Sequence, residues 1–191
     1  PFFIHENGDI ILFELLKQYN FSVSQVRNII EQGHDKSGNR YESNTHLATT
    51  HSDKLIIDKL KSDFFKEEFM IESVFKCNQL PINLNMESIS KNQISNLTPH
   101  NANYIYVDYS KLIFPLTLRH WKKGDRIYPY GLNGSKKIQD LFSDLKLNLF
   151  QKKDVWILES GGKIMWVVGI KADKRFSVGN NSEQIIKISV Y

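Results

Sequence analysis

The chain has 191 residues, of which 41% are hydrophobic and 24% charged, so it is long enough for one large or two small domains and too apolar for a disordered protein. Its one cysteine, Cys77, excludes an internal disulfide, and no Cys/His spacing resembles a zinc site. No apolar run approaches the roughly 18–20 residues that a membrane helix needs. We therefore expect a cytosolic protein in which Cys77 is a small buried hydrophobe.

Charge is distributed unevenly along the sequence. Residues 110–175 contain 14 Lys/Arg and 6 Asp/Glu, a net charge of +8, whereas the remaining residues contain 11 and 15, a net charge of −4. A basic part joined to an acidic part indicates contact with a polyanion through the basic part alone. A well-solvated basic surface is the alternative explanation.

Helical periodicity opens the chain. Apolar residues predict one helix from Asp9 to about Tyr19 and a second that starts after Ser22. Ser22 and Gln25 have the spacing of a capping box, and Gly33 is the expected C-cap of the second helix. The two helices predict an αα-hairpin.

The pattern then changes to short strands. Strands are expected within 40–50, 55–57, 69–71, 74–75 and 82–89, with a tight reversal at 52–54. The polar stretch 95–103, which contains Pro99, is interpreted as a linker or long loop. We place a domain boundary there, between a first domain of residues 1–103 and a second of residues 104–191.

The second domain is predicted to be rich in strands. Strands are expected at 104–108, 116–119, 127–128, 155–158, 164–168 and 185–190, with one short helix at 136–145 capped by Ser135. The predicted fold class is therefore α+β: a helical hairpin with a small sheet, followed by a β-rich module with one short helix.

Two glycine-containing segments are candidates for phosphate contact. Ser160-Gly161-Gly162 resembles the start of the phosphate loop of ATP pyrophosphatases, but the Asp-Ser that should follow is missing and a strand follows instead of a helix, so a hairpin turn is predicted. The segment from Gly131 to Lys137 combines two glycines with Lys136 and Lys137 ahead of the predicted helix. Local features leave this segment open between a phosphate contact and a glycine turn with solvated lysines.

Aromatic and basic residues alternate between Arg119 and Tyr130, a composition that suits stacking on bases and pairing with phosphates. At strand spacing, Trp156 and Trp166 favour the core, while Trp121 stays undecided. Asp173 and Arg175 could form an ion pair that orients Arg175, and Arg175 could equally reach a phosphate.

No catalytic constellation stands out. The six histidines are scattered, and His46 and His51 have no evident acidic or nucleophilic partner, so they are interpreted as surface or packing residues. No metal site is predicted. The chain begins at Pro1 with neither an initiator Met nor a signal peptide, which indicates an excised fragment.

A long motif carries a family resemblance. The stretch from Phe114 to Gly131 closely resembles the start of the C-terminal domain of the tRNA(Ile)-lysidine synthetase family, whose pattern is R-x-W-x-x-G-D-R-[FI]-x-P-x-G. The family's G-x-K-K loop, D-x-[FL] helix and D-x-R-[FY] ending are matched by 134–137, 140–142 and 173–176. Residues 12–43 look like the family's central domain, and the resemblance is weakest over 59–103.

The resemblance implies a function for the whole enzyme. The family adenylates the wobble cytidine of an isoleucine tRNA with ATP and Mg²⁺ and then joins free lysine to it, so that the tRNA reads AUA. An N-terminal pyrophosphatase-type domain, absent here, performs this ligation, and no catalytic residue is assigned to this chain. The C-terminal domains hold the tRNA, and the last is similar to a domain of the phenylalanyl-tRNA synthetase β chain.

These observations predict a tRNA-binding piece that is inactive and free of cofactors by itself. The predicted RNA contacts are Arg119, Lys122, Lys123, Arg126, Lys136, Lys137 and Arg175, and the predicted loop-shaping residues are Gly124, Gly131 and Gly134. The alternative is a protein-interaction or dimerisation module whose aromatic residues form an interface. The sequence leaves a homodimer open.

Overall fold

The computed structural model describes residues 8–33, 38–52, 54–60, 67–74, 80–94 and 102–191. The chain forms two compact units, residues 1–64 with 148–152 and residues 65–147 with 153–191. This division lies earlier than the boundary that the sequence indicated near residue 103, because strands at 68–71 and 84–89 pair with strands from the later part of the chain. Cys77 and most of the expected linker lie outside the described residues.

The first unit begins with the predicted helical hairpin. Helix α1 (Gly8–Leu16) continues as a 3-10 turn (Lys17–Tyr19), and helix α2 (Val23–Gln32) follows. The capping box is present, since the Ser22 hydroxyl accepts from the amide of Gln25 and the Gln25 side chain accepts from the amide of Ser22. These contacts satisfy two amides that would otherwise lack partners at the start of α2.

A three-stranded antiparallel sheet follows the hairpin in the first unit. Its strands β1 (Arg40–Glu42), β2 (His46–His51) and β3 (Lys54–Lys59) lie in sequence order. Apolar side chains of both helices, of the turn between them and of β2 form one cluster: Leu16, Phe21, Val26, Ile29 and Ala48. The Ser43 hydroxyl donates to the carbonyl oxygen of Tyr19 at 2.7 Å, which joins the sheet to the hairpin.

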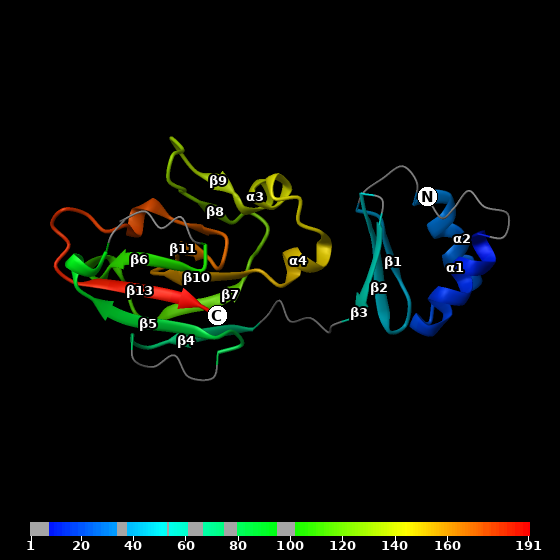
Figure 1. The fold of residues 1–191 in the computed structure, drawn as a ribbon, viewed down its shortest axis with the longest axis horizontal. Coiled ribbons are helices and arrows are strands. Elements are labelled where there is room, and N and C mark those ends of the chain that lie inside the picture. The colour runs from blue at the N-terminus through cyan, green and yellow to red at the C-terminus, as the bar shows by residue number, and fades with distance from the viewer. Residues whose placement is uncertain (1–7, 34–37, 53, 61–66, 75–79, 95–101) are drawn as a thin grey trace. The chain divides into compact units, whose positions relative to one another are not determined.

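The second unit contains two larger antiparallel sheets (Figure 1). One has the order β12-β11-β10-β7-β4, from strands Lys171–Ala172, Lys163–Val167, Trp156–Ser160, Leu116–His120 and Glu68–Ile71. The other has the order β5-β13-β6, from strands Leu84–Ile89, Ile185–Val190 and Tyr104–Asp108. The last strand of the chain is therefore the central strand of its sheet.

The main apolar core of the second unit lies between these two sheets. Alternate residues of both contribute, among them Leu116, Leu118, Ile186 and Ile188, each 0% exposed. Trp166 is fully buried and Trp156 packs half-buried against the same cluster, so both tryptophans belong to the core, as predicted.

A third layer covers the other face of the five-stranded sheet. It consists of a two-stranded ribbon, β8 (Arg126–Ile127) with β9 (Lys136–Lys137), and helix α3 (Ile138–Asp144). Its apolar side chains form a second cluster with Ile157 and Val167 of the sheet. A further short helix, α4 (Leu149–Lys153), was not expected, and most of its residues are grouped with the first unit.

The prediction of a helix from Lys136, capped by Ser135, is wrong at its start. Lys136 and Lys137 are extended and pair with Ile127 and Arg126, so the helix begins at Ile138 without a side-chain cap. The amide of Ile138 donates to the carbonyl oxygen of Asp125 at 2.9 Å. The first amide of α3 is thus used within the protein and not left for an anion.

The prediction for Ser160-Gly161-Gly162 is confirmed. Ser160 and Lys163 are paired ends of β10 and β11, and the two glycines between them have φ of 54° and 71°. Two left-handed residues in a two-residue loop form the hairpin turn whose twist matches that of the strands. The segment is therefore not a phosphate loop.

Asp108 closes the end of β6. Its carboxylate accepts from the amide of Ser110 at 3.0 Å and from the hydroxyls of Ser110 and Ser182 at 2.7 and 2.5 Å. Burial acts to raise the pKa of Asp108, but the hydrogen bonds from Ser182 and Ser110 outweigh it, and the pKa is lowered. Asp108 thereby joins β6 to the following 3-10 turn (Tyr109–Lys111) and to the segment that leads into β13.

Candidate nucleic-acid interface

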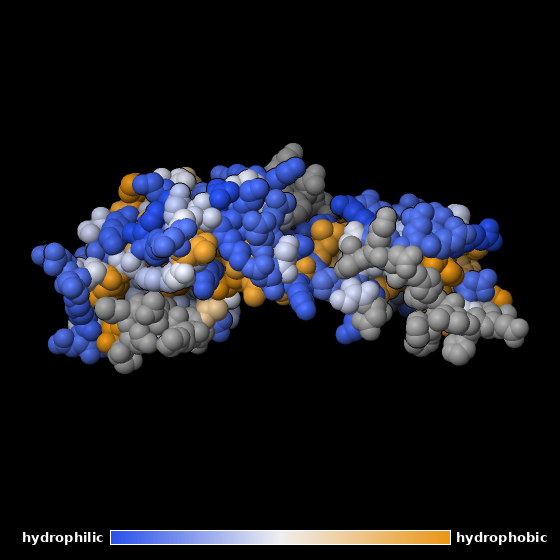
Figure 2. All heavy atoms as spheres, turned by 90° about the horizontal axis from the view of Figure 1, so that it is seen from above, coloured by the Kyte–Doolittle hydropathy of each residue, from blue (hydrophilic) through white to orange (hydrophobic). Residues whose placement is uncertain are grey.

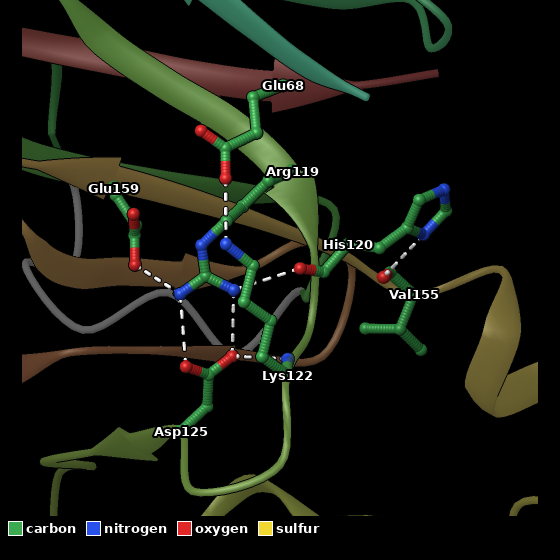
Figure 3. A network of polar contacts seen from close by, with 7 residues as sticks. All are labelled: Glu68, Arg119, His120, Lys122, Asp125, Val155 and Glu159. Carbon is green, nitrogen blue, oxygen red and sulfur yellow. Dashed lines mark hydrogen bonds and ion pairs between the residues drawn. The ribbon is translucent and has the colours of Figure 1, made fainter. Parts of the chain in front are cut away.

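Arg119 lies at the centre of a buried ion-pair cluster next to the basic ribbon (Figure 3). It is 6% exposed, on the face of β7 opposite the main core. One terminal nitrogen donates to Asp125 at 2.8 Å and to the carbonyl oxygen of His120 at 2.9 Å. The other donates to Asp125 at 3.0 Å and to Glu159 of β10.

The electrostatics of this cluster favour the charged forms. Burial acts to lower the pKa of Arg119, but the hydrogen bonds and charges of Asp125 and Glu159 outweigh it and raise the pKa. A guanidinium whose terminal nitrogens are occupied by two carboxylates and a carbonyl oxygen has little left to offer a phosphate. Arg119, predicted as an RNA contact, is therefore better described as a structural residue.

Lys122 belongs to the edge of the same network. Its ammonium nitrogen lies 2.7 Å from a carboxylate oxygen of Glu68 in β4, and both side chains are about half exposed. The hydrogen bond from Lys122 lowers the pKa of Glu68. Figure 3 shows the two side chains pointing toward each other beside Arg119. An exposed pair of this kind exchanges readily with solvent and contributes little to stability.

Asp125 organises the turn that leads into β8. Besides Arg119, its carboxylate accepts from the amide of Lys122 at 2.7 Å, and its own amide donates to the carbonyl oxygen of Lys122 at 3.1 Å. Gly124 has φ of 99°, a conformation that side-chain-bearing residues rarely adopt. Gly131 and Gly134, in the loop between β8 and β9, also have positive φ, of 79° and 119°.

The ribbon brings two positive charges face to face. Arg126 and Lys137 are directly opposite partners, and both are exposed. Arg126 donates to the hydroxyl of Ser135 at 2.7 Å and to its carbonyl oxygen at 3.3 Å, both neutral acceptors. In the described part of the chain neither Arg126 nor Lys137 has an acidic partner, and the same holds for exposed Lys123. Like charges placed opposite each other in a ribbon repel, so this surface favours an anion.

Two further predicted contacts are paired with acids. Lys136 forms an ion pair with Asp144 at the end of α3. Arg175 lies 2.8 Å from Asp173, whose carboxylate is fully buried and also accepts from the amide of Tyr128. The Asp173–Arg175 pair considered from the sequence is therefore present, and its acid is buried.

Arg175 also lies over an aromatic ring. Its guanidinium carbon is 4.1 Å from the centre of the Tyr128 ring, the geometry of a cation–π contact. The hydrogen bond to Asp173 is the main reason why the pKa of Arg175 is raised. Trp121, left undecided by the sequence, packs edge-to-face on Phe142 with ring centres 5.1 Å apart, so it serves the second apolar cluster.

The structure therefore separates the predicted contacts into two groups. Lys123, Arg126 and Lys137 are exposed and lack acidic partners within the described ranges, whereas Arg119, Lys122, Lys136 and Arg175 are paired with carboxylates. Seen from the side on which the ribbon lies in Figure 1, this part of the second unit is mostly hydrophilic (Figure 2). The sequence did not identify the acidic partners Glu68, Asp144 and Glu159, because each is brought into place by long-range pairing or by the helix boundary.

Within the described ranges there is no group of three or more His, Cys, Asp or Glu residues that could hold a metal ion. Over the same ranges, no helix has the length and apolar character needed to cross a bilayer.

Two family models match the chain, and both describe substrate domains. Residues 5–60 match the TilS substrate binding domain, and residues 116–189 match the TilS substrate C-terminal domain. The first match lies in the first unit, the second lies in the second unit except for residues 148–152, and together they take in more than half of the chain. The chain therefore belongs to the TilS family, the tRNA(Ile)-lysidine synthases.

Individual relatives agree with this assignment. The tRNA(Ile)-lysidine synthase of Parabacteroides distasonis is 35% identical over 181 residues, which is 95% of this chain and 41% of that protein. The enzyme of the same name from Bacillus subtilis is 43% identical over 74 residues, 37% of this chain and 16% of that protein. The chain thus spans less than half the length of the curated relatives that it matches.

A solved structure has the same fold. It is described as the crystal structure of a TilS C-terminal domain, with a TM-score of 0.51 and 21% identity, and the match covers 65% of this chain and 96% of that chain. The likeness supports the α+β assignment and the β-rich architecture of the second unit.

Proposed function

We propose that this chain holds tRNA for a tRNA(Ile)-lysidine synthase, with the β8–β9 ribbon as a phosphate contact. The observation that carries the proposal is the pair of opposed cations, Arg126 and Lys137, exposed on one ribbon without acidic partners in the described residues. Phosphate contacts position a folded RNA and supply much of its affinity, and A-form RNA is recognised largely through its shape and backbone.

The proposed partner is the isoleucine tRNA after which the relatives, the tRNA(Ile)-lysidine synthases, are named. In the complete enzyme, ATP with Mg²⁺ and free lysine would react with the wobble cytidine at another domain. The Ser160-Gly161-Gly162 segment of this chain is a hairpin turn, so we assign no ATP contact to it. The proposed location is the cytosol, where tRNA is modified.

The test is a charge reversal on the ribbon. Lys137→Glu replaces one of two like charges with an acid that can pair with Arg126, so the free energy of unfolding should stay the same or rise by about 0.2–1 kcal/mol. Binding of a labelled isoleucine tRNA transcript, followed by fluorescence anisotropy at several salt concentrations, should weaken. The slope of log Kd against log salt should fall by about 1 or more for the lost phosphate contact.

Lys163→Glu is the matched control, because Lys163 is exposed in the same unit and makes the same change in charge. We expect it to alter affinity much less than Lys137→Glu. Equal effects of the two variants would mean that only net charge matters, and an unchanged affinity of Lys137→Glu at low salt would remove the ribbon from the interface.

A second candidate function is protein contact through the helical hairpin. Ile10, Ile11 and Leu15 of α1 are 58%, 50% and 52% exposed, and Val23 of α2 is 55% exposed. Several exposed apolar side chains on one helical hairpin suit a contact with another protein. Sedimentation velocity of the chain over a range of concentrations tests self-association, and a species that stays monomeric throughout would leave RNA binding as the favoured function.

A further inference from the structure

We infer that the cluster of Arg119, Asp125 and Glu159 is a positioning device for RNA binding: it holds the turn at 122–125 so that Lys123, Arg126 and Lys137 are presented together. The inference rests on the proposed function of the ribbon. None of the three cluster residues is assigned a contact with RNA.

The first argument is that the ribbon has little structure of its own. Each strand contributes two residues, and the pairing consists of Arg126 with Lys137 and Ile127 with Lys136. A two-stranded ribbon of this length is not independently stable in water. Its position must therefore come from the rest of the second unit.

The second argument is that Asp125 fixes the position of the ribbon through hydrogen bonds with three different parts of the second unit. Its carboxylate accepts from Arg119 of β7 and from the amide of Lys122, and its carbonyl oxygen accepts from the amide of Ile138, the residue after Lys137. One residue thus fixes the entry to β8 and the exit from β9 relative to the five-stranded sheet.

The third argument concerns geometry across the sheet. Arg119 receives Asp125 in a bidentate pairing at 2.8 and 3.0 Å and is held from the other side by Glu159 on β10 (Figure 3). A planar guanidinium held by two carboxylates fixes the direction as well as the distance of each partner. The turn is therefore tied to two strands of the rigid core.

The fourth argument is one of charge. Glu68, Asp125 and Glu159 place three carboxylates around two cations, Arg119 and Lys122, which leaves the network with an excess of negative charge. Negative charge close to a phosphate-binding surface weakens attraction for RNA. The charge of these acids lowers the affinity for RNA. They can favour binding only by holding the basic residues in position.

The charge of the surface and the positioning of the ribbon therefore predict opposite changes in tRNA affinity when an acid of the cluster is neutralised. Asp125→Asn removes one negative charge while keeping the size of the side chain. If only the field of the surface mattered, the variant would bind the isoleucine tRNA transcript more tightly. Positioning by the cluster predicts the reverse, a loss of affinity of about threefold to tenfold, with a salt slope smaller by about 1 as ribbon contacts are lost.

Glu183→Gln is the control, because Glu183 is exposed in the same unit and lies outside the cluster. It makes the same change in charge and should alter Kd by less than about twofold. A purely structural loss of folded protein would lower the active fraction in a stoichiometric titration without altering the salt slope, so the slope separates positioning from unfolding.

Glu159→Gln provides a second route if Asp125→Asn does not fold. It leaves the bidentate Arg119–Asp125 pairing in place and should weaken binding less than Asp125→Asn, in the same direction and again with a reduced salt slope. Tighter binding, or binding equal to that of Glu183→Gln, in the folded variants would overturn the inference. A wild-type chain that shows no salt-dependent tRNA binding would instead overturn the proposed function itself.

Discussion

Asp108 is a buried carboxylate held mainly by hydroxyl and amide donors, and it gives the chain a pH-sensitive point at the scale of one residue. Its pKa is lowered from the ordinary value of 3.8 by the hydrogen bonds from Ser182 and Ser110, which outweigh the effect of burial. A group whose pKa is lower in the folded than in the unfolded chain stabilises the fold above its ordinary pKa. That stabilisation is lost as the pH falls through the folded pKa.

We expect Asp108→Asn to lower the free energy of unfolding by about 1 kcal/mol at neutral pH, through loss of charge-assisted bonds at a capping position. The difference from wild type should shrink as the pH falls below 3.8, because the wild-type carboxyl then becomes protonated as well. Urea denaturation at a series of pH values measures this difference in the free energy of unfolding. The exposed Asp140→Asn variant is the control, and a difference that stays constant down to acid pH would show that the charge of Asp108 is not responsible.

At the scale of single elements, the hairpin between β10 and β11 depends on backbone conformation more than on contacts. Gly162 has φ of 71°, and a Cβ added there would meet no atom within 4 Å. A substitution at this position is therefore limited by the left-handed conformation alone. Asparagine tolerates that conformation better than other non-glycine residues, and β-branched residues tolerate it worst.

Gly162→Asn should leave the midpoint of thermal unfolding nearly unchanged, whereas Gly162→Val should cost about 1–2 kcal/mol. Differential scanning fluorimetry of the two variants provides the comparison. Equal destabilisation by both would point to crowding and not to backbone strain. Gly161 is unsuitable for the same comparison, because its added Cβ would lie 2.7 Å from the side chain of Ile113.

Elements with a strong local pattern could be predicted from the sequence, and those that depend on distant partners could not. The strands 104–108 and 185–190 were predicted with their observed bounds, because alternating or continuous apolar residues are bordered by clear breaks. Lys136 and Lys137 were assigned to a helix because Ser135 is a suitable cap ahead of helically spaced apolar residues, whereas their strand is created by pairing with Arg126 and Ile127. The burial of Arg119 likewise required partners 6 and 40 residues away.

For the whole molecule, each unit contains its own apolar cluster. Leu118 is 0% exposed in the core between the two sheets of the second unit, and the cluster around Val26 and Ile29 lies in the first. Leu118→Ala should remove about 2–5 kcal/mol from the stability of the second unit. We expect faster amide exchange throughout β7, β10 and β13, read by hydrogen–deuterium exchange with mass spectrometry.

The helix α2 should keep its wild-type exchange rates in the same experiment, since none of its side chains belongs to the cluster that contains Leu118. Val26→Ala gives the converse test and should loosen α2 and β2 while leaving β13 protected. Faster amide exchange in both units of either variant would show that the two units unfold as one cooperative body.

The central place of β13 has a consequence for synthesis on the ribosome. Strands β5 and β6 both bond to β13 and not to each other, although residues 84–108 are made long before residues 185–190. Among the described strands β13 is the sheet partner of both, so during translation they stay unpaired until residues 185–190 leave the exit tunnel. The second unit must therefore finish folding after residue 190 has emerged, and its two waiting strands are exposed to chaperones and to misplaced partners while residues 109–184 are being made.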